Sequence, residues 1–564
     1  MPETYDLKSV KLPRMTGSIL KAFTAMLESP VTRWLLINNL LKQGGILALR
    51  EMSVDEPPTF QPPVPPAAQP STEGQNMHAL IALADFKPQA QKGFNFNTIM
   101  DYAVAYRSGA TTPETVAEHI LAAFKDSQTC DPSMNIFITW MKDDLMAQAN
   151  SATERIRSGN PLSIMDGVPV PVKDEIDMLP FGTTVGTSFL GTTPAKQDST
   201  VVARMRAAGA MLIGKCNMHE IGIGVTGQNP HHGTVRNPYN PNHHTGGSSS
   251  GPAAAVAAGF GPVAIGADGG GSIRLPAGFC GVVGLKPTFS RISEFGAAPL
   301  CWSVAHIGPI AATAYDAAIG YSILAGSDPK DSHTLNQPEV TLTGFNQLDL
   351  SDLTLGIYWP WFRHSTPEVV SGCETLLNGL KSLGVGIREV EIPGLDAARV
   401  AHIISITSEM NAALECYYKD HRKDYSQEVR INLSLSRAFT PQDYIQSQRI
   451  RTRFSNTMEQ VLKQVDVIVT PTSAVTAPPI RPDSLPDGDS DLTLLTEIMR
   501  YATPANLTGH PAISFPAGYT PQGLPIGFQA IGRYWQEHTL LRLAYAAEGL
   551  VERRKPQIYF DLLG

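Results

Sequence analysis

The chain has 564 residues, a formal net charge of −8 and only 17% charged side chains, with 48 glycines and 44 prolines. This composition is typical of a compact α/β enzyme with many tight loops, built as one large domain with accessory segments, and argues against a disordered or mainly helical protein. The sequence shows no basic stripe, so no nucleic-acid partner is expected.

The spacing of the cysteines and the hydropathy pattern indicate the cellular compartment. Six cysteines are scattered and form no C-x-x-C pair, which predicts free thiols in a reducing, intracellular environment. No secretory signal is apparent, and no apolar run reaches the roughly 18 residues of a membrane span. Any membrane association is therefore expected to be peripheral.

Residues 1–53 are predicted to form an amphipathic helical extension. Apolar residues at helical spacing predict one face of a helix capped by Ser18 and ended by Pro30, and a second apolar segment, 31–41, is broken by Gly44 and Gly45. The first face comprises Ile19, Leu20, Phe23, Met26 and Leu27. Two hypotheses remain open: packing on the enzyme itself or on a second subunit, or a monotopic membrane contact in which Trp34 and apolar neighbours enter the interface.

A proline-rich strap, residues 54–76, follows the extension and is expected to hold the chain extended as a surface linker. The catalytic domain is assigned to residues 77–564. It begins with helical patterns at 98–106 and 113–124, where Pro113 is suited to the first helical position after Thr112.

From Gly167 onward the sequence has α/β character. Short apolar runs predict buried strands, and Ala-rich helical stretches and Gly-rich loops separate them. The tail is expected to form two strands joined by the turn 520–523. The predicted strands lie at 168–172, 210–213, 263–265, 465–469 and within 512–532.

Two serine-containing motifs carry the chemistry. Residues 245–251 read Thr-Gly-Gly-Ser-Ser-Ser-Gly, and residues 268–272 read Asp-Gly-Gly-Gly-Ser. Between them, a helix of about nine residues spans about 14 Å and a returning strand of about six residues spans about 20 Å. The first motif and Ser272 should therefore meet at one edge of the sheet, outside the carboxyl ends of the strands, where sites form in open α/β folds.

The glycines before Ser272 predict an oxyanion hole. Without Cβ atoms, the backbone N–H groups of Gly269, Gly270, Gly271 and Ser272 can turn inward as an anion-attracting nest. Such donors are commonly worth about 3 kcal/mol each to acyl transfer. The alternative is a phosphate-binding loop, but no P-loop Lys-Ser/Thr follows the glycines.

A serine nucleophile needs a base, and no histidine has an evident place beside these motifs. Lys173 directly follows the predicted strand at 168–172 and is the candidate base, since burial can make a lysine neutral. Lys215 and Lys286 occupy similar positions in the pattern, and spacing alone does not exclude them. Adjacent histidines at 231–232 and 243–244 diverge in direction and lack an acidic partner, so neither a metal nor another cofactor is expected.

Together these segments resemble the amidase signature family. The resemblance rests on residues 246–251, 267–276 and 281–287, and on the strand Gly-Val-Pro-Val-Pro-Val-Lys-Asp at 167–174. It implies an amidase-signature α/β fold with a large mixed, mostly parallel sheet, and a Ser–cis-Ser–Lys triad. In that triad Lys173 is the base, Ser248 the proton shuttle and Ser272 the nucleophile. Ser249, Asp268 and Arg274 match residues that support the site.

Within the family, the chain is most similar to the plant-type fatty acid amide hydrolases, nearly end to end. This resemblance implies hydrolysis of N-acylethanolamines by a peripheral, dimeric membrane protein. It places Gly222, Ile223 and Val225 along the acyl channel, where the side chains differ from the family pattern. Two alternatives use the same triad: a short-chain or aryl amidase, or a glutamine amidotransferase A-subunit. A catalytically idle lipid-binding scaffold is a third alternative, disfavoured by the intact triad.

Overall fold

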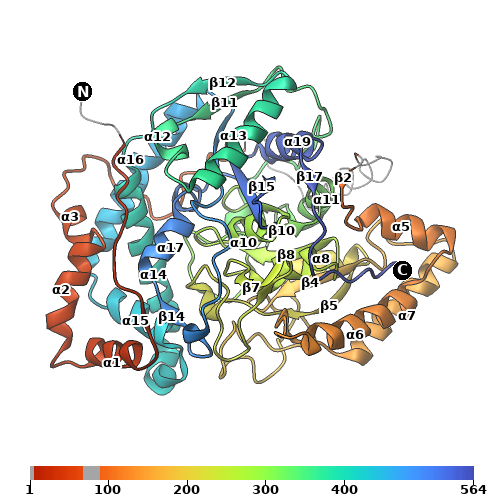
Figure 1. Ribbon diagram of the computed structural model, residues 1–564, viewed down its shortest axis with the longest axis horizontal. Coiled ribbons are helices and arrows are strands. Elements are labelled where there is room, and N and C mark those ends of the chain that lie inside the picture. Colours follow the sequence, from red (N-terminus) through yellow and green to blue (C-terminus); the bar gives the residue numbers. More distant parts are fainter. Residues whose placement is uncertain (1–4, 68–88, 90) are drawn as a thin grey trace.

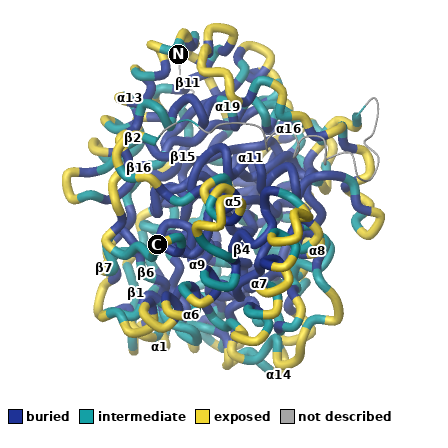
Figure 2. The backbone as a smooth tube through the Cα atoms, turned by 90° about the vertical axis from the view of Figure 1, so that its right-hand side faces the viewer, coloured by how far each residue is buried: buried dark blue, intermediate teal, exposed yellow. Residues whose placement is uncertain are grey.

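A mixed sheet of eleven strands forms the centre of the molecule in a computed structural model, which describes residues 5–67, 89 and 91–564 (Figure 1). In spatial order the strands are β12 (Gly386–Glu389), β11 (Thr354–Ile357), β13 (Val467–Pro471), β16 (Pro525–Gly532), β15 (Ala512–Tyr519), β9 (Val283–Lys286), β10 (Ile307–Ala311), β8 (Val263–Ala267), β4 (Pro169–Lys173), β5 (Met211–Cys216) and β3 (Phe137–Thr139). The backbone of this region is deeply buried, and exposed backbone lies mainly at the periphery (Figure 2).

Short strands form three further ladders. They pair β1 (Met15–Thr16) with β14 (Asp489–Ser490), β2 (Lys92–Gly93) with β17 (Glu552–Arg553), and β6 (Arg236–Asn237) with β7 (Asn240–His244). The first of these ties the N-terminal segment to the distant loop before residue 492. The second brings the C-terminal segment beside Lys92 and Gly93.

Helices surround the sheet. In chain order they are α1 (Gly17–Glu28), α2 (Arg33–Gln43), α3 (Ile46–Arg50), α5 (Ile99–Ser108), α6 (Pro113–Thr129), α7 (Lys142–Arg157), α8 (Thr200–Ala207), α9 (Ser250–Ala257), α10 (Arg274–Phe279), α11 (Ala314–Leu324), α12 (Trp359–Phe362), α13 (Pro367–Ser382), α14 (Leu395–His421), α15 (Gln427–Ser436), α16 (Pro441–Leu462), α17 (Leu492–Met499), α18 (Thr503–Thr508) and α19 (Glu537–Glu548). The 3₁₀ turns within the described residues are η1 (Glu220–Gly222), η2 (Ser332–Asn336), η3 (Arg422–Asp424) and η4 (Pro482–Ser484).

The α/β fold, the predicted strands and the paired tail strands β15 and β16 are confirmed. The helices at 98–106 and 113–124 are confirmed as α5 and α6, with Pro113 at the start of α6 and Thr112 as its cap. The expectation of a mostly parallel sheet needs correction: within the described residues, four strand pairings are parallel and six are antiparallel. The expected parallel pairing is found among three neighbouring strands: β4 lies between β8 and β5 and runs parallel to both.

The N-terminal extension packs against helices of the same chain. In Figure 1, α1, α2 and α3 lie together at the side of α14, α15 and α16. Leu20 and Leu27 are buried against Ile431 of α15, and Glu28 accepts hydrogen bonds from Arg430 at 2.6 and 2.9 Å. One of the two hypotheses, packing on the same chain, therefore holds for this face of α1.

Two details of the extension differ from expectation. Ser18 is not the helix cap: the β1–β14 pairing holds Met15–Thr16 extended, so α1 begins directly at Gly17 with Thr16 as its N-cap. The expected single apolar face is also divided, since Ile19 and Met26 point outward and remain 68% and 41% exposed. The break at Gly44 and Gly45 is confirmed, and the short helix α3 follows it.

The strap runs along α16 as far as it is described. Arg453 donates to the Glu56 carboxylate and Thr452 to the Pro57 carbonyl, and Trp535 donates to the Pro65 carbonyl at 2.8 Å. Residues 54–67 have no regular helix or strand, in keeping with a linker. Residues 68–76 of the expected strap, and 77–88 of the expected catalytic domain, lie outside the described residues.

Across the described helices, none has both the length and the apolar character that crossing a lipid bilayer requires.

Candidate active site

Parallel pairing of β4 with β8 brings the two predicted motifs together. Val172 lies opposite Ile265, so both strands end at the same edge of the sheet. Lys173 is the last residue of β4, and Asp268 directly follows β8. Helix α9 begins at Ser250, so that Ser248 and Ser249 stand at its N-terminal end. The expected helix-and-strand return is thus confirmed.

Lys173 contacts the first serine of the pair directly. Its Nζ donates to Ser248 Oγ at 2.9 Å and to the Ala267 carbonyl at 3.1 Å, and its side chain is 1% exposed. The peptide bond between Gly247 and Ser248 is cis. Ser272 and Ser248 line the same cavity as Lys173. The three residues predicted for the triad are therefore gathered at one place.

The glycine loop is held from both sides. Asp268 Oδ1 accepts the N–H of Gly271 at 2.6 Å, and Asp268 Oδ2 accepts that of Ile273 at 3.1 Å. On the other side, the His402 imidazole lies 2.7 Å from the Gly269 carbonyl. The expected set of four oxyanion donors is reduced by this geometry, because the Gly271 amide is already occupied. The amides of Gly269, Gly270 and Ser272 remain as candidate donors.

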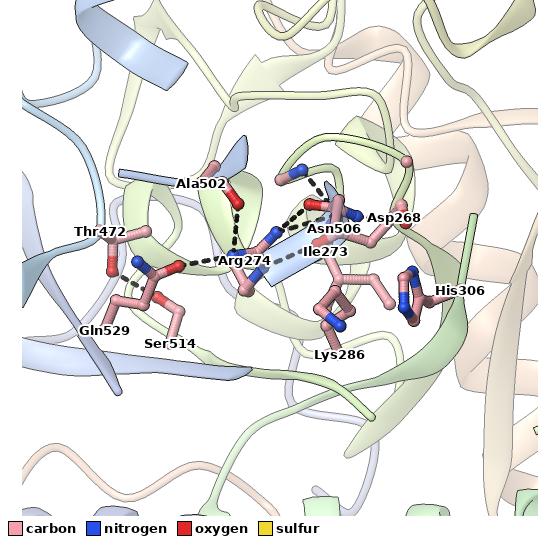
Figure 3. Close-up of polar contacts among 12 residues, drawn as sticks. Asp268, Ile273, Arg274, Lys286, His306, Thr472, Ala502, Asn506, Ser514 and Gln529 are labelled. Atoms are coloured by element: carbon pink, nitrogen blue, oxygen red, sulfur yellow. Dashed lines mark hydrogen bonds and ion pairs between the residues drawn. The ribbon is translucent and has the colours of Figure 1, made fainter. Parts of the chain in front are cut away.

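Asp268 and Arg274 form a fully buried ion pair below this loop (Figure 3). Arg274 Nε donates to Asp268 at 3.0 Å, and its other nitrogens reach the Ala502 carbonyl, Gln529 and Asn506. Burial alone would raise the pKa of Asp268, but Arg274, Lys286 and the hydrogen bond from Asn506 outweigh burial and hold that pKa well below its usual range. Asp268 is therefore an anion that organises the glycine loop.

Ser249 joins the helix start to the strand end. Its Oγ donates to the Ala267 carbonyl at 3.0 Å and accepts the Ala267 N–H at 3.2 Å. Its own N–H donates to the Ser272 carbonyl at 3.2 Å. These contacts fix the first serine motif to the second, which is the supporting position expected for Ser249.

Known proteins share this arrangement of sequence and fold. Residues 118–541 match the family model described as Amidase. The sequence is 39% identical over 588 residues to a fatty acid amide hydrolase of Oryza sativa subsp. indica, covering 99% of this chain and 96% of that protein. The chain belongs to the amidase signature family. It is an amidohydrolase.

More distant members have the same fold as this amidase. The glutamyl-tRNA(Gln) amidotransferase A-subunit of Thermosynechococcus vestitus is 33% identical over 473 residues, covering 79% of this chain and 97% of that one. The solved structure of peptide amidase from Stenotrophomonas maltophilia superposes with a TM-score of 0.70 at 28% identity, covering 82% of this chain and 99% of the other.

The amidase holds its three site residues on a cavity of about 190 Å³. Most of the lining is apolar and comes from the loop 297–307 and from Ile406 and Met410 of α14. Trp302 lines the cavity and is 48% exposed, which places it at the opening. The cavity therefore offers an apolar surface next to a polar, serine-bearing floor.

The loop 297–307 is anchored by Glu409. Its carboxylate accepts the N–H groups of Trp302 at 2.7 Å and Ser303 at 2.9 Å, and also the Tyr444 hydroxyl at 3.0 Å. This anchoring fixes the cavity wall to α14 and α16.

Of the three residues expected along the acyl channel, Gly222 alone lines this cavity. Ile221 also lines it, whereas Ile223 packs in a neighbouring apolar cluster with Ile221 and Leu300. Val225 is buried in another cluster with Leu275 and Phe279. Ile221 has a positive φ of 46° and Gly222 one of 69°, so the chain turns sharply where these two residues border the cavity.

The two other candidate lysines have structural partners instead. Lys215 Nζ donates to the Ile176 carbonyl at 2.6 Å and lies 3.3 Å from Asp174, and Lys286 Nζ donates to the Pro287 carbonyl at 2.9 Å. Burial lowers the pKa of both. Neither lines the cavity, so Lys173 is the lysine in position to act there.

The expectation that the paired histidines lack an acidic partner is wrong for His231, which contacts the Glu220 carboxylate at 2.9 Å because the chain turns back between these residues; His232 contacts the Thr187 carbonyl at 3.0 Å. In the described parts of the chain, no group of three or more His, Cys, Asp or Glu side chains is placed to hold a metal ion.

Several residues of the site were not predicted. Glu175 contacts Lys173 Nζ at 2.9 Å, and Glu294 lines the same cavity. Glu175 lies two residues after Lys173 in the sequence, so its proximity to the candidate base could have been noticed. His402 and Asn506 come from α14 and α18, far away in the sequence, and no local pattern marks them.

Proposed function

We propose that this amidase hydrolyses fatty acid amides, chiefly N-acylethanolamines, to a fatty acid and ethanolamine through a Ser–cis-Ser–Lys triad. The observation that carries the proposal is the hydrogen bond between Lys173 and Ser248 on the cavity that also holds Ser272. The apolar cavity wall supports a fatty acyl group. The 39% identity over 99% of the chain to a protein named fatty acid amide hydrolase supports the substrate class.

In the proposed acylation, Ser272 Oγ forms a bond to the substrate carbonyl carbon. The Ser272 proton passes to Ser248 Oγ, and the Ser248 proton passes to the lone pair of Lys173 Nζ. The carbonyl oxygen becomes an oxyanion and accepts hydrogen bonds from the amides of Gly269, Gly270 and Ser272. The C–N bond then breaks as the amine nitrogen takes a proton from Ser248, which regains one from Lys173.

In the proposed deacylation, water replaces the amine. Water donates a proton to the Ser248–Lys173 pair and attacks the acyl carbon, and Ser272 leaves as the C–O bond breaks. Ser272 recovers its proton through Ser248. The cycle consumes one water and needs no redox step, metal or other cofactor.

A panel of substrates tests the substrate class. We expect N-acylethanolamines to be hydrolysed with kcat/KM rising with acyl length, because each buried CH₂ contributes about 0.8 kcal/mol to binding. The measurement is ethanolamine release by wild type, with glutamine and short-chain and aryl amides as comparators. Turnover confined to glutamine would favour an amidotransferase A-subunit, and turnover confined to short or aryl amides would reject the lipid substrate.

We further propose that the amidase is an intracellular peripheral membrane protein and a homodimer, with its N-terminal helices at the membrane. Ile19, Val31 and Trp34 are 68, 76 and 67% exposed, the highest values for large apolar side chains in the described residues. Ile19 lies near the start of α1, Trp34 on α2, and Val31 in the turn between the two helices. Single exposed apolar residues are ordinary, and the proposal rests on finding the three most exposed ones on this one helical pair. Lys21, a basic residue of α1, forms an ion pair with Asp487 at 2.6 Å. The membrane proposal therefore rests mainly on the exposed apolar side chains.

Liposome co-sedimentation tests the membrane contact. We expect the triple variant Ile19→Ser, Val31→Ser, Trp34→Ser to lose most of its binding to anionic liposomes, because the inserted apolar area is removed. Val104→Ser, which changes a 54% exposed valine of α5, is the matched control and should bind as wild type does. Unchanged sedimentation of the triple variant would reject the membrane proposal. A dimer-to-monomer shift in gel filtration would assign these residues to an interface between protomers.

A further inference from the structure

Glu175 reaches the same nitrogen atom of Lys173 that contacts Ser248. Glu175 Oε2 lies 2.9 Å from Lys173 Nζ, and the two side chains are 11% and 1% exposed. Both residues line the cavity with Ser248 and Ser272. Ser248 Oγ and Glu175 Oε2 also border the same point beside Gly222, since a Cβ added at Gly222 would lie 3.4 Å from the first atom and 3.7 Å from the second.

From this contact we infer that Glu175 is a positioning residue of the proton relay: its carboxylate orients Lys173 Nζ toward Ser248 and neutralises the ammonium that Lys173 becomes during acylation. The inference rests on the proposed function of Lys173 as base. No new covalent step is added. One proton moves from Ser248 Oγ to Lys173 Nζ and back to Ser248 when the amine leaves, and Glu175 takes no proton in the relay.

Other charged or titratable groups around the pair are already compensated or neutral. Asp268 is paired with Arg274, Asp174 with Lys215, and Glu409 accepts backbone N–H groups of the cavity loop. Burial, followed by repulsion from neighbouring carboxylates, raises the pKa of Glu294 and of the Cys301 thiol well above their usual values. Among the described residues, Glu175 is thus the carboxylate in direct contact with Lys173.

The charge has two opposite effects on rate. A carboxylate within 4 Å favours the protonated lysine, so the neutral base appears only at higher pH. The same charge stabilises the ammonium formed during acylation and so supports a higher rate once the base is neutral. Removing the charge should therefore shift the rate–pH profile to lower pH and lower its plateau.

The test is the second-order rate of Ser272 labelling by a long-chain fluorophosphonate, measured against pH on the full chain. This readout requires the nucleophile and base but no amide substrate. For wild type we expect a rate that rises toward alkaline pH. For Glu175→Gln we expect the midpoint to fall by about one pH unit or more and the plateau to fall about tenfold.

Three further variants make the result specific. Glu175→Ala also removes the charge and should lower the midpoint of the rate–pH profile as Glu175→Gln does. Glu175→Asp keeps the charge and should have the wild-type midpoint. Glu374→Gln, the same change in a partly exposed pair with Arg363, should reproduce the wild-type profile. An unchanged midpoint in both charge-removing variants overturns the inference, as does a wild-type profile that is flat.

The outcome for Glu175 is separable from the outcome for the substrate. The expected midpoint shift without any turnover of N-acylethanolamines would support the role of Glu175 and reject the lipid substrate. A wild-type protein that the probe does not label at Ser272 would overturn the inference together with the triad.

Discussion

Replacing Ser272 with alanine is expected to reduce amide hydrolysis by about 10⁵–10⁶-fold, the loss typical of a serine hydrolase without its nucleophile. Ser272 follows the glycine loop, lines the cavity with Lys173 and Ser248, and is 5% exposed. The substitution removes one oxygen and leaves Ser272's backbone N–H in place. The measurement is kcat/KM for the best amide substrate, together with a denaturation curve showing that the variant folds.

The matched control for this variant is Ser250→Ala. Ser250 is a buried serine of the same motif, but it belongs to α9, does not line the cavity, and makes only a long contact of 3.5 Å with the Asn217 carbonyl. We expect its activity to stay within about tenfold of wild type, since a neutral hydrogen bond contributes only about 1 kcal/mol. Comparable losses in both variants would mean that the motif matters for folding rather than for nucleophilic attack.

Replacing Arg274 with methionine is expected to destabilise the protein by about 3–5 kcal/mol, because the variant leaves the buried Asp268 carboxylate without its cation. Arg274 is fully buried and also donates to the Ala502 carbonyl and to Gln529. The measurement is the free energy of unfolding from chemical denaturation. Arg363→Met breaks an exposed pair with Glu374 and should cost no more than about 1 kcal/mol.

The pH dependence of this loss follows from the direction of the Asp268 shift. A carboxyl whose pKa is lower in the folded than in the unfolded state stabilises the fold above the unfolded value, near pH 4, and this stabilisation is lost as pH falls further. In Arg274→Met, burial acts on the Asp268 pKa without its main opposing charge and raises it, so the stability gap between wild type and variant should be wide at neutral pH, begin to narrow above pH 4 and be smaller still at pH 3. A gap that is constant down to pH 3 would contradict the proposed pairing.

Local spacing predicted that the two serine motifs meet at one sheet edge, from the expected lengths of the helix and strand between them. It left Lys173 as one of three candidate lysines. The resemblance to the amidase signature family then favoured Lys173 over Lys215 and Lys286. The structure adds the physical reason, which is that the other two lysines donate to backbone carbonyls away from the cavity.

What could not be predicted depends on long-range packing. The antiparallel pairing of β10 with β8 and β9 follows from how the chain returns after Ile307, and no local pattern encodes it. The Gly271 amide was expected to face the substrate, but Asp268 occupies it. The outward position of Ile19 depends on α1 meeting Ile431, which is 412 positions further along the chain.

Peptide mapping by mass spectrometry after treatment with a long-chain fluorophosphonate tests the nucleophile directly. If Ser272 is the nucleophile, one adduct forms, on Ser272; it is absent from Ser272→Ala and forms within about tenfold of the wild-type rate in Ser250→Ala. An adduct on Ser248 or Ser249, or no adduct on the folded wild-type protein, would contradict the assignment of Ser272 as the nucleophile.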